Sequence, residues 1–232
     1  MGRVRSAVVA VVLLVTVVVA NPWAQVAAPQ APAIPPELAL DRSLPVDTAV
    51  RTGRLPNGIR YFIRQNGRPA KRVSMRLAVN VGSLQEEPDQ RGLAHFIEHM
   101  AFNGTENFKP GELVSFLESI GARFGPHVNA STSFDETIYM LDIPTDRPGY
   151  VDRGMLVLHD FAAGLSLLPA EVEKERGVVL EEWRGRLGAG SRLTDKQLPV
   201  IFQGSRYADR LPIGLPEVLK SAPRERLVAF YQ

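Results

Sequence analysis

The stretch that decides the fold is Gly92-Leu93-Ala94-His95-Phe96-Ile97-Glu98-His99-Met100. We predict a short helix here, and in a helix the residues at i, i+3 and i+4 share one face. His95, Glu98 and His99 therefore project together. Two imidazoles one turn apart can each offer a nitrogen to one Zn²⁺, and the carboxylate between them lies beside the metal, where it can take a proton from water. The stretch predicts a two-histidine metal site of the order His-x-x-Glu-His.

The same five residues would also fit a helix with two surface histidines and a solvated glutamate, so a third ligand is needed. The chain has no cysteine, and any metal site must use histidine and carboxylate. A charged helix predicted over residues 169–182 is the natural source. Glu175 and Glu182 stand two turns apart on nearly one stripe of this helix. The spacing proposes this pair and does not choose the ligand between them.

The flanking sequence predicts paired strands followed by long helices. Asn57-Gly58 is typical of a tight hairpin turn. Residues 73–81 alternate, with their apolar side chains on one face. The predicted strands are residues 59–64, 73–81 and 137–143, and the predicted helices include residues 110–120, 150–167, 169–182, 216–221 and 224–232. This order favours an α+β fold, an antiparallel sheet with helices packed on one face.

The N-terminus has the pattern of a secretory signal peptide. Arg3 and Arg5 precede an apolar run over residues 7–20, which is shorter than the about 20 residues that a bilayer-spanning helix needs. We predict a signal peptide over 1–20, with cleavage after Ala20 or near Ala28, and an exported protein, periplasmic or secreted. An uncleaved membrane anchor is the alternative. Residues 21–46 are rich in proline and alanine and predict a linker.

The folded domain is predicted over residues 47–232, and its last helical pattern stops at Gln232, so we expect the domain to lack its final elements. The net charge is only +2, and no basic run with interleaved aromatic residues is present. These features exclude nucleic acid from the expected partners.

The stretch from Gly92 to Thr105, with Gly82 ten residues earlier, resembles the active-site signature of the pitrilysin/insulinase family of zinc peptidases. Residues 116–122, 129–133, 135–137 and 175–184 resemble the same family in the same order. The resemblance extends over roughly residues 50–232 and is closest to the bacterial, exported branch. It implies the metallopeptidase domain of the pitrilysin and mitochondrial processing peptidase type.

The resemblance also implies roles for particular residues. The third zinc ligand falls on Glu182, completing a set with His95 and His99 around one Zn²⁺ per domain. Glu175 matches an accessory glutamate that supports the ligand set. Asn129 and Ala130 match an edge strand beside the metal, to which a peptide substrate can add as a further strand.

We therefore expect a metalloendopeptidase that hydrolyses peptides or unfolded proteins, with Glu98 as general base for metal-activated water. The resemblance implies that further similar domains or a partner subunit close the active-site chamber. The alternative is an incomplete or non-catalytic domain that binds metal and peptide and needs a missing C-terminal half or a partner for turnover.

Overall fold

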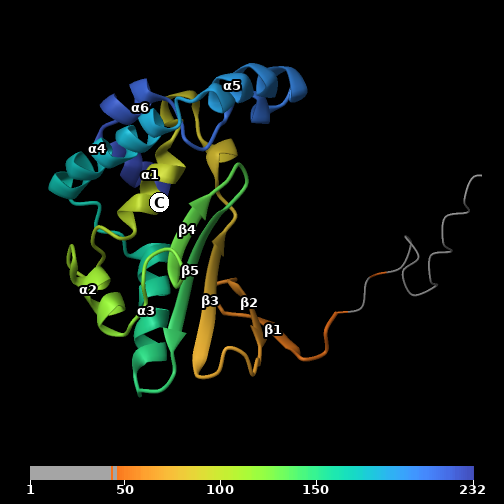
Figure 1. Ribbon diagram of the computed structural model, residues 1–232, viewed down its shortest axis with the longest axis vertical. Helices are drawn as coiled ribbons and strands as arrows, with labels where there is room; N and C mark the ends of the chain where they lie inside the picture. Colours follow the sequence, from red (N-terminus) through yellow and green to blue (C-terminus); the bar gives the residue numbers. More distant parts are fainter. Residues whose placement is uncertain (1–42, 44–45) are drawn as a thin grey trace, which may run out of the picture. The chain divides into compact units, whose positions relative to one another are not determined.

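A computed structural model of the chain describes residue 43 and residues 46–232 (Figure 1). The predicted signal peptide and nearly all of the predicted linker lie outside the described residues. The chain divides into two units, Met1–Gln65 and Asn66–Gln232. Within the part of the chain that the structure describes, none of the helices has both the length and the apolar character needed to cross a membrane.

The first unit contributes a hairpin of two antiparallel strands, β1 (Val50–Arg54) and β2 (Arg60–Arg64). The predicted turn at Asn57-Gly58 is present. Gly58 has φ of +93°, a backbone conformation that glycine adopts without a steric penalty. Asn57 supports the turn, because its Oδ1 accepts a hydrogen bond from the Ile59 N–H at 3.2 Å. β1 was absent from the sequence prediction.

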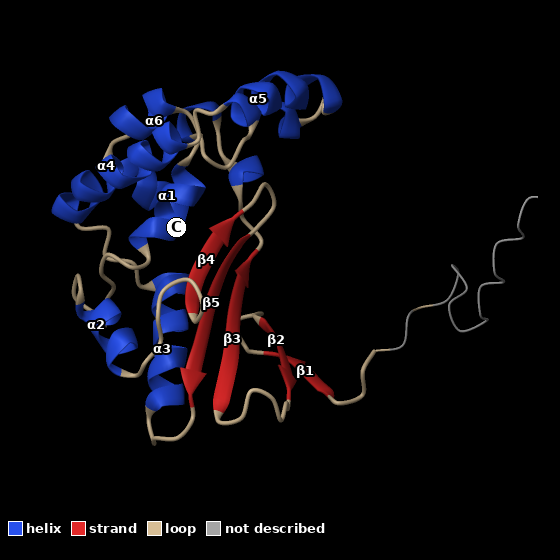
Figure 2. Cartoon of the chain, in the orientation of Figure 1, coloured by secondary structure: helices blue, strands red, loops and turns tan. Residues whose placement is uncertain are grey.

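The second unit is built on a three-stranded antiparallel sheet (Figure 2). Its order is β3 (Arg72–Val79), β5 (Thr137–Pro144) and β4 (Val128–Thr132), so that β5 lies in the centre and β4 at an edge. Side chains of β5 alternate between fully and partly buried positions. This alternation is typical of a sheet with one face on a core and the other less covered.

Helices cover the buried face of this sheet. α3 (Tyr150–Ala163) packs along β3 and β5, and α2 (Glu112–Ser119) adds Leu113, Phe116 and Leu117 to the same core. The cluster also contains Met75, Leu141 and Ile143 from the strands and Val157 and Phe161 from α3. Layers of this kind bury the apolar face of the sheet under helices. The predicted α+β class is confirmed.

The helix predicted over residues 150–167 was too long at its C-terminal end. α3 ends at Ala163, and the chain then runs antiparallel to the segment around Thr105, which bridges Leu165. The Glu106 N–H donates to the Gly164 carbonyl at 2.7 Å, and the Ser166 N–H donates to the Gly104 carbonyl at 3.2 Å. These long-range bonds replace the helical bonds that the local pattern favoured.

A second core cluster lies around the helix that carries the histidines. α1 (Leu93–Met100) buries Leu93, Phe96 and Met100 completely. These side chains form one cluster with residues of α4 (Pro169–Gly185), α6 (Pro216–Ser221) and α7 (Arg224–Tyr231), namely Val172, Val179, Leu219 and Leu227. The sequence did not predict α5 (Ala189–Ile201), in which no residue is buried and Pro199 lies inside the helix.

The N-terminus of α1 is capped by a carboxylate from outside the helix. Glu86 is fully buried, and its two oxygens accept hydrogen bonds from the N–H groups of Gly92 and Ala94, each at 2.9 Å. The first N–H groups of a helix have no partner within it, so this contact satisfies two of them. Burial raises the pKa of the Glu86 carboxyl to about 7, against the opposing effects of these hydrogen bonds and of Arg210 and Arg91.

This shifted pKa predicts a stability that falls as the pH rises between about 4.5 and about 7. In that window the unfolded chain has released the Glu86 proton and the folded chain still holds it, so a higher pH favours unfolding, by up to roughly 3 kcal/mol. Urea unfolding of the wild type and of Glu86→Gln across this range measures the effect. The wild type should lose stability relative to the variant, and a constant difference between them would contradict the assignment.

Candidate metal centre

Two helices bring the candidate ligands together. His95, Glu98 and His99 belong to α1, and Glu182 belongs to the last turn and a half of α4. The apolar stripe of α1 packs against Val172 and Val179 of α4, so the two helices are fixed to each other through their buried faces. Arg176 of α4 ties this helix to the C-terminal end of α6, because its guanidinium donates to the carbonyls of Leu219 and Ala222.

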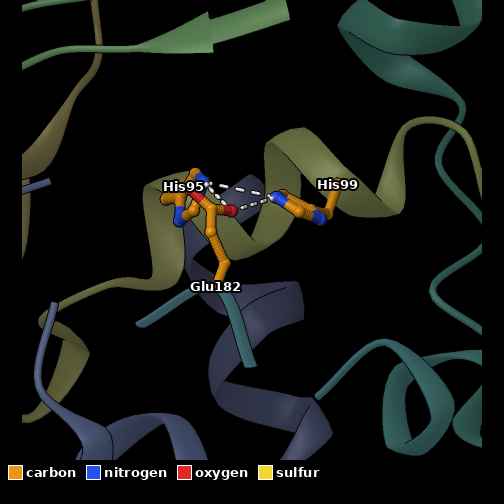
Figure 3. A group of neighbouring side chains, drawn as sticks. All are labelled: His95, His99 and Glu182. Atoms are coloured by element: carbon orange, nitrogen blue, oxygen red, sulfur yellow. Dashed lines mark hydrogen bonds and ion pairs between the residues drawn. The ribbon is translucent and has the colours of Figure 1, made fainter. Parts of the chain in front are cut away.

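Three ligand atoms from these helices converge on one point (Figure 3). The Nε2 atoms of His95 and His99 are 3.2 Å apart. The Oε2 atom of Glu182 lies 3.4 Å from Nε2 of His95 and 3.3 Å from Nε2 of His99. In the described part of the chain, this is the group of histidine and acidic side chains whose geometry could hold a metal ion.

The triangle has the dimensions of a zinc site. Zinc binds imidazole nitrogen and carboxylate oxygen at about 2.0–2.2 Å in tetrahedral geometry, which places neighbouring ligand atoms about 3.3–3.6 Å apart. The three observed separations, between 3.2 and 3.4 Å, fall close to this range. Three protein ligands leave a fourth position open, which is the arrangement of catalytic rather than structural zinc sites.

His99 is oriented by a pair of residues behind it. Its Nδ1 lies 2.8 Å from Oε1 of Glu175, and Oε2 of Glu175 accepts a hydrogen bond from Asn103 Nδ2, also at 2.8 Å. Burial lowers the pKa of His99, and the contact with Glu175 outweighs it, so the pKa is raised. With the Nδ1 proton directed at Glu175, the Nε2 lone pair of the neutral ring points into the triangle.

The other two ligand candidates are tuned differently. Burial, followed by the nearby His99, lowers the pKa of His95 to about 4, which leaves its ring neutral at physiological pH. Burial opposes ionisation of Glu182, and the hydrogen bond from Arg186 to its Oε1, at 2.7 Å, lowers the pKa overall. Arg186 therefore occupies one oxygen of Glu182 and leaves Oε2 for the triangle.

Glu98 lies beside the triangle without joining it. It is buried, its pKa is raised by that burial, and its Oε2 accepts a hydrogen bond from Thr132 Oγ1 of β4 at 2.7 Å. A carboxylate with a raised pKa next to a metal site is suited to accept and return a proton near neutral pH.

A cavity of about 380 Å³ opens over these groups. The two histidines, Glu98 and Glu182 line it on one side, and residues 130–132 of the edge strand β4 line another. Pro212 and Ile213 add an apolar wall, and Arg186 adds a cation. Ala130 thus faces the site. Asn129 lies on the same strand but outside the cavity lining, is exposed, and its Oδ1 accepts from the Ala130 N–H at 3.0 Å.

The sequence predicted roles for His95, Glu98, His99, Glu182 and Glu175, and these five side chains lie together in the structure. The sequence predicted no role for Asn103, Thr132 or Arg186. The i, i+4 spacing of Glu182 and Arg186 in one helix is a signal that could have found the last of these. Asn103 and Thr132 lie within stretches that resemble the family, which is a signal that could have found them, but their partners are distant in sequence and helix or strand spacing does not identify them.

Comparison with known proteins identifies the family of the chain. The sequence model described as "Insulinase (Peptidase family M16)" matches residues 61–187, more than half of the chain. The chain belongs to the insulinase family of peptidases. The resemblance drawn from the sequence is thereby confirmed, together with its α+β metallopeptidase domain.

Relatives in the insulinase family include proteins named as zinc proteases. The zinc protease PQQL-like of Arabidopsis thaliana is 46% identical over 180 residues, which cover 78% of this chain and 19% of that protein. The probable zinc protease PqqL of Escherichia coli K12 is 38% identical over 190 residues, 82% of this chain and 20% of that protein. The chain therefore spans about a fifth of the length of these curated relatives.

Solved structures of insulinase-family proteins have the same fold. The first half of the periplasmic protease PqqL from Escherichia coli matches with a TM-score of 0.78 and 38% identity, covering 82% of this chain and 41% of that one. The ferredoxin protease FusC, in complex with Arabidopsis ferredoxin, matches with a TM-score of 0.73 and 34% identity, covering 79% of this chain and 20% of that one.

Two adjacent glutamates of α4 provide a matched test of the ligand set. Glu182 contributes to the triangle, whereas Glu181 is exposed and pairs with Arg184. We expect Glu182→Gln to weaken zinc binding by more than roughly 100-fold, since loss of a supporting residue alone typically costs 10–100-fold. Glu181→Gln should bind zinc as the wild type does. Competition with a fluorescent chelator measures both affinities, and equal affinities for the two variants would remove Glu182 from the ligand set.

Proposed function

We propose that this chain is the zinc-binding domain of an endopeptidase, with the metal held by His95, His99 and Glu182. The observation that carries the proposal is the triangle of ligand atoms with the Glu98 carboxylate beside it. Membership of the insulinase family and the zinc proteases among the relatives support it. One zinc ion per domain would polarise the scissile carbonyl and lower the pKa of water to about 7 when bound.

The side chains around the triangle would transfer the proton and orient the ligands. Glu98 accepts a proton from the attacking water at Oε1, the oxygen that does not accept from the Thr132 hydroxyl, and returns it to the leaving amine. Its raised pKa suits both transfers. Glu175 holds His99 in the tautomer that binds metal, and Asn103 holds Glu175 in turn.

The proposed substrate is an extended stretch of polypeptide, in a peptide or an unfolded protein. β4 is an edge strand and borders the cavity, so a substrate can pair with it as an additional strand at Asn129 and Ala130. Main-chain hydrogen bonds carry little side-chain information, which suits an enzyme that accepts varied sequences. The complex of FusC with ferredoxin shows a polypeptide bound to one relative.

We also propose that the protein is exported. The apolar run over residues 7–20 would be its signal peptide, residues 21–46 a linker, and residues 47–232 the peptidase domain. The relative in Escherichia coli is described as periplasmic, which supports this compartment. Cell fractionation of the tagged protein, with and without residues 1–20, tests the proposal.

The alternative is a domain that binds zinc and peptide and needs further domains or a partner subunit for turnover. This alternative is motivated by the length of the match, because the chain spans only about a fifth of each of these curated relatives. Zinc content and cleavage of a quenched peptide, each with and without chelator, separate the two. Cleavage abolished by chelator and restored by zinc supports the peptidase, and stoichiometric zinc without cleavage supports the alternative.

Removal of the proposed base should separate chemistry from metal binding. Glu98→Gln is expected to keep its zinc, because Glu98 is outside the ligand triangle, and to lose about 10²–10⁴-fold in kcat. Glu118→Gln, at an exposed position of α2, is the control and should retain activity. Zinc analysis and quenched-peptide kinetics provide the measurements. A zinc-loaded Glu98→Gln protein with full activity would rule out the assigned role.

A further inference from the structure

Thr132 connects the edge strand β4 to the proposed base. Its Oγ1 donates a hydrogen bond to Oε2 of Glu98 at 2.7 Å, from the last residue of β4 to the middle of α1. The backbone of the same residue also contributes a hydrogen bond that lowers the pKa of Glu98 against the effect of burial. The Glu98 carboxylate is buried, and a buried carboxylate without a donor would be costly. The position of the base therefore depends on a single residue of β4, whose side chain makes the 2.7 Å contact.

The surroundings of Thr132 leave its proton for Glu98. Thr137 lies opposite Thr132 in the register of β4 and β5, and the two hydroxyl oxygens are 3.4 Å apart. Thr137 Oγ1 donates to the Val81 carbonyl at 2.9 Å. A hydroxyl has one hydrogen to donate, so the proton of Thr137 is used by Val81 and that of Thr132 by Glu98.

A threonine at this position also restricts the direction of the hydroxyl. Its branched Cβ limits χ1 in a strand, and the paired backbone of β4 and β5 fixes the residue itself. The hydroxyl is aimed from a rigid element, whereas Glu98 has a longer and more flexible side chain. The hydroxyl binds Oε2, so Oε1 takes no part in this hydrogen bond, and Glu98 is among the residues that line the cavity.

We propose that Thr132 is a positioning residue that holds Glu98 in the orientation required for proton transfer. The inference rests on the proposed function, in which Glu98 moves the proton. It assigns to β4 a second role besides substrate pairing, because the strand whose residues 130–132 line the cavity also orients the base. Substrate and base are then positioned by the same strand.

The test compares two substitutions of Thr132 that each change one of the two groups on its Cβ. Thr132→Val keeps the branched shape and removes the hydroxyl, and Thr132→Ser keeps the hydroxyl and removes the methyl group. Thr132→Val should lower kcat by about 10–100-fold, the usual effect of losing a hydrogen bond to a charged group, with KM within about 3-fold of the wild type. Thr132→Ser should recover most of that kcat.

Controls separate positioning from a structural effect. Zinc content of Thr132→Val should match the wild type, and its Tm should fall by only several degrees, as expected for one lost buried hydrogen bond. Thr145→Val, at an exposed position just after β5, should leave the kinetics unchanged. The proposal is overturned by a Val variant with wild-type kcat, by a Ser variant as impaired as the Val variant, or by a Val variant that loses zinc or is unfolded at the assay temperature.

A structural readout makes the test independent of turnover. In crystal structures of the zinc-free wild type and Thr132→Val, the Glu98 carboxylate should leave its position in the variant. A carboxylate that stays in place would overturn the positioning role. Failure of the wild type to cleave peptides with zinc bound would instead contradict the proposed function, so the two failures are distinguishable.

Discussion

The packing of α1 against α4 is the contact on which the candidate metal centre depends. One stripe of α1 is fully buried with Leu93, Phe96 and Met100, and α4 contributes Val172 and Val179 to the same cluster. Each such side chain stabilises the arrangement by roughly 1.5–3 kcal/mol. Because this apolar stripe fixes the axial position and rotation of α1, the histidines on its other face come within 3.4 Å of a glutamate more than 80 positions later in the chain.

Three ionisable groups of the centre each have a side-chain partner that orients them. Arg186 holds one oxygen of Glu182, Glu175 holds the far nitrogen of His99, and Thr132 holds one oxygen of Glu98. Burial shifts the pKa of His95 downward and that of Glu98 upward, which keeps the imidazole neutral and makes the carboxylate a better base. The supporting residues come from β4, α4 and the turn after α1. β4 packs into the first core cluster and α4 into the second, so both clusters hold elements that support the centre.

Much of the fold followed from local pattern. The strands at residues 72–79 and 137–144 and the helices at residues 112–119, 169–185 and 216–221 correspond to predicted elements, because alternation and helical spacing reflect which face is buried. Errors arose where distant contacts overrode the pattern. The helix after Tyr150 ends at Ala163 because the chain pairs with the segment around Thr105, and α5 has no buried face that a periodicity could reveal.

The sequence by itself determined that His95, Glu98 and His99 share a helix face, because their spacing follows from the helical repeat. It also proposed Glu175 and Glu182 as a pair on one stripe of a second helix, and the family resemblance chose between them. The tertiary structure shows the positions themselves, with Glu182 in the triangle and Glu175 behind His99, and it alone decided that Thr132 reaches Glu98. The physical reason is that distances between separate elements depend on how their apolar faces pack, which no local repeat encodes.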